Sequence, residues 1–184
     1  PAVEGMYRID QSVHGKTRGD YVVQLPPEYN PLRSYPCIVA LHPLGATAEG
    51  QLDYWSGAIA ADGKSRMGQG ARHGFVVVAP RWMREGQRDY ESTPREHAEV
   101  LAAVRDAMRR VSIDADRVFI TGLGPGGSAA WDIAISHPDM WAGLISISGE
   151  PNNYMRHYGP NASYVPMYLV FGELAGAPAP LIKH

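Results

Sequence analysis

The chain has 184 residues, of which 45% are hydrophobic, and its formal net charge is -2. This length and composition suit one compact domain over residues 1–184 that buries its core without disulfides or metals. The Lys and Arg residues are scattered and form no basic stripe, which argues against a nucleic-acid partner. No apolar run is long enough for a transmembrane helix, so no membrane span is predicted.

The two ends and the cysteine content give further limits. The chain begins with Pro1 instead of an initiator Met, and no charged-then-apolar signal pattern follows. We expect it to be part of a larger protein, so its N-terminus leaves the cellular location open. Cys37 is the only cysteine, which excludes an internal disulfide and a multi-cysteine zinc site. Its apolar neighbours predict a buried structural thiol.

Short β-branched runs alternate with longer segments of helical period. This alternation predicts an α/β fold with three layers, in which helices cover both faces of a mostly parallel, doubly wound sheet. The predicted strands are residues 20–25, 37–41, 75–79, 117–121, 143–147 and 166–171. Because these runs lack a polar alternation, we expect them to be buried on both faces.

The clearest predicted helix begins after Thr93. Thr93-Pro94-Arg95-Glu96 is typical of a capping box with proline at the first helical position. One face of this helix carries apolar residues at helical spacing: Val100, Ala103, Val104, Ala107, Met108 and Val111.

A second helix is expected from about Gly126 to Ser136, where Pro138 stops it. Its inner face consists of small residues: Ala129, Ala130, Ile133 and Ala134. Residues 45–72 predict one irregular helix or two short ones, and residues 80–92 predict a polar loop.

A glycine-dense turn lies between the strand at 117–121 and the second helix. Its sequence, Gly122-Leu123-Gly124-Pro125-Gly126-Gly127, resembles the nucleophile elbow G-x-S-x-G of the α/β-hydrolases. The resemblance is to prolyl-oligopeptidase-like peptidases, carboxylesterases, phospholipase-carboxylesterases and polyester depolymerase relatives. His42-Pro43-Leu44-Gly45 is similar to the loop that supplies one oxyanion donor in that fold, and His137-Pro138-Asp139 fits the same pattern.

The resemblance covers about Tyr21 to Gly176 and implies an α/β-hydrolase fold that lacks its last strand and helix. It also implies a serine at the centre of the turn, where Gly124 stands without a side chain. The residue after the nucleophile supplies a backbone NH to the oxyanion hole in that fold, and here it is Pro125, which has none. Loss of one such donor costs about 3–4 kcal/mol of transition-state stabilisation.

The remaining catalytic groups also depart from the pattern of the family. Gly172-Glu173-Leu174-Ala175 resembles the G-x-x-D segment with Ala175 at the acid position, and Glu173 is a candidate for a relocated acid. The base His of the family is expected beyond His184, which we interpret as the cut end of a longer protein. The resemblance therefore predicts a domain that has lost acyl-transfer chemistry.

The predicted function is binding, in a cleft that His42, Leu44, Gly45 and Leu123 would line. The ligand would be a small molecule, a peptide or a partner domain, and no cofactor is expected. An alternative is an active serine hydrolase that uses Ser128, or residues beyond the chain end, on ester or peptide substrates. A third is a structural domain of a larger protein.

Other interpretations of the same residues are weaker. Ser128 as the nucleophile would require the strand to continue through Pro125, and proline is poorly tolerated in a central strand. The glycine turn partly matches a dinucleotide fingerprint, but Pro125 removes an NH that an anion would use. The histidines, including His42 and His137, show no pair at a spacing that suits a metal site.

Overall fold

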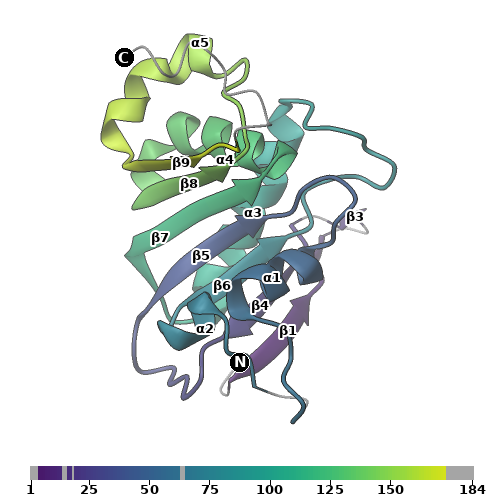
Figure 1. Cartoon of the computed structure of the whole chain (residues 1–184), viewed down its shortest axis with the longest axis vertical. Coiled ribbons are helices and arrows are strands. Elements are labelled where there is room, and N and C mark those ends of the chain that lie inside the picture. The colour runs from purple at the N-terminus through teal and green to yellow at the C-terminus, as the bar shows by residue number, and fades with distance from the viewer. Residues whose placement is uncertain (1–3, 14–15, 18, 63–64, 173–184) are drawn as a thin grey trace.

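The computed structural model describes residues 4–13, 16–17, 19–62 and 65–172. Seven strands form one sheet in the order β1-β4-β6-β5-β7-β8-β9 (Figure 1). The β1–β4 and β4–β6 pairs are antiparallel, and the other neighbours are parallel. The strands are β1 (Gly5–Ile9), β4 (Tyr21–Leu25), β5 (Tyr35–Leu41), β6 (Val76–Pro80), β7 (Ile113–Leu123), β8 (Gly143–Ile147) and β9 (Met167–Val170).

All six predicted strands are present, and the mostly parallel sheet is confirmed. Sequence analysis missed β1 and the small hairpin of β2 (Ser12–Val13) and β3 (Lys16–Thr17). It also made β7 too short, because this strand begins four residues before the predicted start at residue 117.

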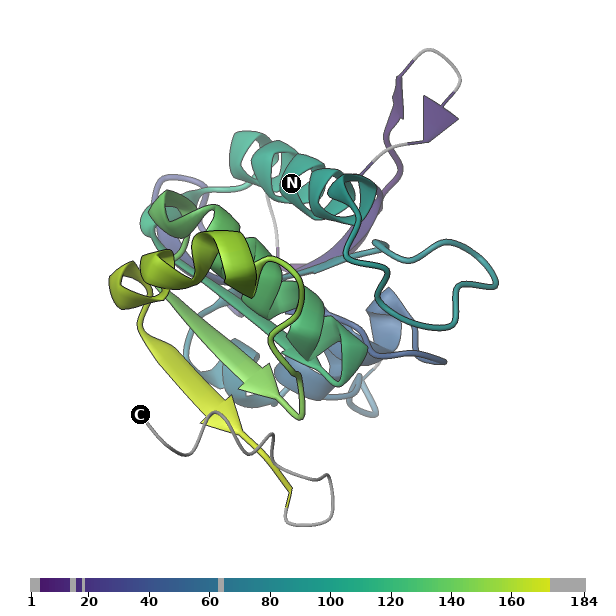
Figure 2. The ribbon, with the colours of Figure 1, turned by 90° about the horizontal axis from the view of Figure 1, so that it is seen from above.

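The helices cover the two faces of the sheet, as Figure 2 shows. On one face α3 (Pro94–Arg110) and α4 (Pro125–Ser136) pack on a core that includes Val39 and Ile120. On the other face α1 (Ala48–Ser56) packs against Ile38 and Ala40, and α2 (Gln69–Arg72) contacts β6. The shorter helices are η1 (Pro138–Met140), α5 (Met155–Tyr158) and η2 (Gly159–Tyr164).

Burial of the central strands follows from these two layers. Every residue of β4 and β6 is buried, because successive side chains point alternately to the two covered faces. The predicted burial of Cys37 in β5 is confirmed, since only 1% of the residue is exposed. Residues 45–72 contain two short helices, which was one of the two alternatives for this region.

The prediction that β9 is buried on both faces was wrong. Tyr168 of β9 is 68% exposed, and it borders an apolar hollow of about 250 Å³ beside Phe119 and Ile145. The reason is that α1 and α2, within the described residues, make their contacts with β4, β5 and β6. The apolar run at 166–171 therefore predicted a strand correctly, but it did not predict that one face of this strand is exposed.

The capping box at the start of α3 is confirmed. The Thr93 hydroxyl accepts a hydrogen bond from the Glu96 backbone NH, and Glu96 Oε2 accepts one from the Thr93 NH at 2.8 Å. Both bonds use backbone donors that have no partner within the helix. They fix the point where the chain leaves the loop after β6 and enters the layer that covers β7.

Replacing Thr93 with Ala should lower the free energy of unfolding by about 1 kcal/mol, because one helix donor loses its acceptor. Urea denaturation at neutral pH measures this loss. Thr93→Ser keeps the hydroxyl and should lie within a few tenths of a kcal/mol of the parent chain. Equal losses in the two variants would show that the cap is not the cause.

Candidate functional site

Gly124 is the single residue between β7 and α4, at the carboxyl end of the parallel strands (Figure 1). Its φ of 55° and ψ of -123° match the first central residue of a type II′ turn, a position dominated by glycine. Its NH donates to the Ile147 carbonyl at 2.8 Å, and its carbonyl accepts from the Ser128 NH at 3.0 Å. A Cβ placed at Gly124 would meet no atom within 4 Å, so the space beside it is open.

The glycines on either side of the bend are required by close packing. A Cβ at Gly122 would lie 2.1 Å from the Gly126 carbonyl oxygen, and a Cβ at Gly126 would lie 2.4 Å from the Leu41 carbonyl oxygen. Real Cβ atoms do not approach backbone this closely. The first turn of α4 therefore rests directly on the ends of β7 and β5.

The loop after β5 lies beside this bend. Leu41 pairs with Gly122 across the parallel strands, and a Cβ at Gly126 would also come within 2.9 Å of the His42 carbonyl oxygen. Leu44 is 48% exposed, and Gly45 has a φ of 75°. The structure thus brings together the two segments that sequence analysis assigned to one site.

His42 is held in the protein interior. Its Nδ1 lies 3.1 Å from the Pro43 carbonyl oxygen, and its ring centroid is 5.8 Å from that of Trp82, which is fully buried. Burial lowers the pKa of His42 below its ordinary value, so the uncharged ring is favoured. This environment fits a structural histidine.

Pro125 and Ser128 both lie in the first turn of α4. Pro125 is its first residue and has no NH to donate. The Ser128 hydroxyl accepts a hydrogen bond from the Glu150 backbone NH at 2.9 Å. That bond attaches the segment after β8 to α4. Ser128 itself lies one helical turn beyond Gly124.

Three of the remaining predicted site residues lie outside the part of the chain that the structure describes. Glu173, Ala175 and His184 belong to residues 173–184, which the structure does not describe. Leu123 ends β7 and is half-buried next to Gly124.

Sequence reasoning missed the segment that follows β8. Ser148 has a φ of 53°, which is uncommon for a residue with a side chain. A Cβ at Gly149 would lie 2.4 Å from the Gly127 carbonyl carbon, so this segment passes against the start of α4. The Ser-Gly pair directly after a predicted strand was the available signal, because such pairs mark turns.

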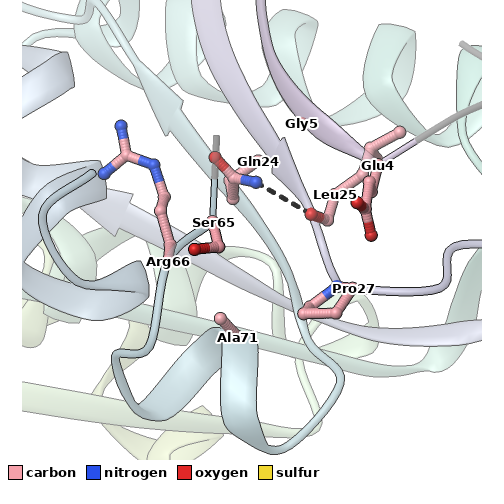
Figure 3. Close-up of a pocket in the computed structure, with 8 residues that line it drawn as sticks. All are labelled: Glu4, Gly5, Gln24, Leu25, Pro27, Ser65, Arg66 and Ala71. Carbon is pink, nitrogen blue, oxygen red and sulfur yellow. Dashed lines mark hydrogen bonds between the residues drawn. The ribbon is translucent and has the colours of Figure 1, made fainter. Parts of the chain in front are cut away.

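A small pocket lies far from this bend, at the antiparallel edge of the sheet. Glu4, Gln24, Ser65 and Arg66 line it together with neighbouring apolar groups, and it encloses about 90 Å³ (Figure 3). The Gln24 amide donates to the Leu25 carbonyl at 2.9 Å, the bond drawn in Figure 3. Neither Gly124 nor His42 lines this pocket.

Two further features were sought among the described residues: a metal site and a membrane-spanning helix. They contain no group of three or more His, Cys, Asp or Glu side chains that could hold a metal ion. Among the helices of the same described residues, none has the length and apolarity needed to cross a bilayer.

If packing requires Gly122 and Gly126, and backbone conformation alone favours glycine at Gly124, substitutions at the three positions should differ in cost. Gly124→Ala should lower the free energy of unfolding by about 1–3 kcal/mol, through backbone conformation alone. Gly122→Ala and Gly126→Ala should each cost about 3 kcal/mol or more, because the methyl group collides with a backbone carbonyl.

Urea denaturation of the three variants measures these costs. Gly86→Ala is the matched control, since Gly86 has a φ of 77° and open space around it. It should cost about 1–2 kcal/mol. A Gly122→Ala variant as stable as the Gly86→Ala variant would contradict the packing argument.

Comparisons with known proteins give the fold and a group of relatives. NocK of Nocardia uniformis subsp. tsuyamanensis, provisionally named an esterase, is 28% identical over 143 residues, which are 75% of this chain and 39% of NocK. Poly(3-hydroxyalkanoate) depolymerase C of Paucimonas lemoignei is 30% identical over 128 residues, which are 63% of this chain and 28% of the depolymerase. No family model matches the chain.

Among solved structures, the crystal structure of a thermostable esterase has a TM-score of 0.67 at 20% identity and covers 90% of this chain. The chain spans 45% of that esterase and less than two fifths of the two sequence relatives. The chain has the α/β-hydrolase fold, and the proteins that it resembles are esterases and a depolymerase.

Proposed function

We propose that this chain is an esterase-like α/β-hydrolase domain that performs no acyl transfer at its elbow and instead binds a small ester or peptide. Gly124 is the observation that carries the proposal. It stands where the β7–α4 bend would present a nucleophile, with open space beside it and no reactive atom.

Two further residues support the loss of chemistry. Pro125 stands where the fold takes a backbone NH for the oxyanion hole, and it offers no donor. Ser128 is a nearby hydroxyl, but it lies within α4 and accepts a hydrogen bond from the Glu150 NH. A nucleophile needs a base within hydrogen-bond reach, and this serine is instead used to hold backbone.

The alternative is an active serine hydrolase that uses Ser128 or residues beyond the chain end. The esterase and depolymerase relatives favour it, because their names describe ester cleavage. A purely structural domain is the third possibility, and a persistent failure to find any ligand would favour it.

A fluorophosphonate probe separates silent from active protein, because it reacts with activated serines. The parent chain and Ser128→Ala should both remain unlabelled, with an active serine esterase as the positive control in the same gel. Labelling of the folded parent chain that is lost after heat denaturation would establish an activated serine. Its further loss in Ser128→Ala would identify the nucleophile.

Binding can be tested with methyl 3-hydroxybutyrate, a small ester related to the polymer in the name of the depolymerase relative. Saturation-transfer NMR should show contact between the ester and the protein, with the ester unhydrolysed over a day. Leu44→Asp should weaken binding about tenfold, since it places a charge on the exposed apolar part of the loop beside Gly124.

Leu32→Asp is the matched control for Leu44→Asp. Leu32 is also exposed and precedes β5, whereas Leu44 follows that strand, so the two leucines lie at opposite ends of it. Leu32→Asp should bind like the parent chain. Absence of saturation transfer in the parent chain would remove the binding part of the proposal, and appearance of 3-hydroxybutyrate would remove the silent part.

A further inference from the structure

Three polar side chains are buried together between α3, α4 and the loop after β6. Asp132 of α4 is 0% exposed, His97 of α3 is 4% exposed, and Tyr90 of the loop is 6% exposed. The Tyr90 hydroxyl lies 2.7 Å from His97 Nε2 and 3.0 Å from Asp132 Oδ2. Nothing in the proposed function uses these groups, although burying them unpaired would be costly.

The same cluster holds the segment that runs past the candidate site. Asp132 Oδ1 accepts a hydrogen bond from the Asn152 NH at 3.4 Å, and Ser128, one helical turn earlier, accepts from the Glu150 NH at 2.9 Å. The ring of Tyr154 then packs on His97, with centroids 4.4 Å apart. Residues 149–152 are thus attached to α4 at two points, immediately after their close contact with Gly127.

The hydrogen bonds of the cluster can run in either direction, because a tyrosine hydroxyl has one hydrogen to donate. When Asp132 is ionised, Tyr90 donates to it, and neutral His97 donates from Nε2 to the Tyr90 oxygen. When Asp132 is protonated, it donates to Tyr90, Tyr90 donates to His97 Nε2, and the ring hydrogen of neutral His97 is on Nδ1. The bonds that join Tyr90 to His97 and to Asp132 are made in both arrangements.

We propose that Asp132, Tyr90 and His97 form a proton-sensitive latch, in which protonation of Asp132 reverses the hydrogen-bond chain and loosens residues 149–152 beside Gly124. The loosening follows from the loss of charge on Asp132. A bond to an ionised acceptor is roughly twice as strong as one between neutral groups, so the hydrogen bond from the Asn152 NH weakens when Asp132 is protonated.

The surroundings place this change in an accessible pH range. Burial raises the pKa of Asp132 to about 6, against the hydrogen bonds from Tyr90 and Asn152, which lower it. Burial, and secondly the charge of His137, lowers the pKa of His97 to about 4, against Glu96, which raises it. The His137 ring faces His97 edge-on, with ring centroids 6.5 Å apart. Burial lowers the pKa of His137, Asp139 raises it and Arg105 lowers it. The ring of Tyr154 also packs on His97.

The two shifts act on stability with opposite signs. The raised pKa of Asp132 gives a contribution that is present at low pH and lost as pH rises through about 6. The lowered pKa of His97 gives a contribution that is present above its ordinary value and lost as pH falls towards about 4. Between pH 4 and 6 the two contributions largely cancel, so the whole chain should show little pH dependence from this cluster.

Replacing either Asp132 or His97 should therefore reveal the pH dependence of stability that the other group contributes. In Asp132→Asn only His97 titrates, so the unfolding equilibrium constant should fall about 100-fold from pH 4 to 6.5. In His97→Gln only Asp132 of this cluster titrates, so the same constant should rise about 30-fold from pH 4 to 6. Urea denaturation across this range, with Ser128→Ala as a control for other titrating groups, measures both slopes.

Amide hydrogen exchange tests the latch itself. After correction for the intrinsic pH dependence of exchange, Glu150 and Asn152 in the parent chain should be several-fold less protected at pH 5 than at pH 7. Asp132→Asn should remove this difference between pH 5 and pH 7. Ser128→Ala should lower the protection at both pH values but leave the difference between them. Tyr90→Phe leaves the titrating groups in place, breaks the chain between them, and should lower protection at both pH values.

Two results would overturn the latch: equal corrected protection of Asn152 at pH 5 and pH 7 in the parent chain, or an unchanged difference in Asp132→Asn. If Asp132→Asn does not fold, Tyr90→Phe with protection equal to that of the parent chain is a third such result. Exchange needs no ligand, so these outcomes are independent of whether the surface at Gly124 binds an ester.

Discussion

The close crossing of α4 over the end of β7 is the constraint on which the site depends. Gly122 and Gly126 leave less room between helix and strand than a single methyl group would need. The same contact reaches the Leu41 carbonyl, so the ends of β5 and β7 and the start of α4 are fixed together. Gly124 turns the chain within this contact, and its NH joins the turn to the end of β8.

Sequence patterns predicted the parts of the fold that local chemistry controls. The β-branched runs found the central strands, and the Thr93–Glu96 pair located the start of α3 to the residue. β1 was missed because its GMYRI sequence carries arginine and methionine on a half-covered edge, where no apolar run is required. The exposure of β9 was missed because an apolar run marks a strand without specifying what covers it.

For the candidate site, too, sequence predicted what depends on local patterns and missed what depends on tertiary contacts. The glycine spacing indicated a sharp bend between strand and helix, and in the structure the His42 backbone lies beside Gly126 of this bend. The Asp132 cluster could not be found in this way, since its members come from three elements and Tyr90 was assigned to a polar loop. A signal was present, because Asp132 lies between Trp131 and Ile133 in an otherwise apolar helix and must be paired when buried.

The geometry of the bend and the chemistry of the fold are separable. Gly122 and Gly126 are required by the contact between backbone and backbone, which gains nothing from a nucleophile at position 124. A glycine at 124 relieves the strain that a side chain would carry at a φ of 55°. Packing therefore preserves the bend whether or not a reactive group stands on it. Likeness to esterases in fold gives the position of this surface, where Gly124 has no side chain and Pro125 has no NH.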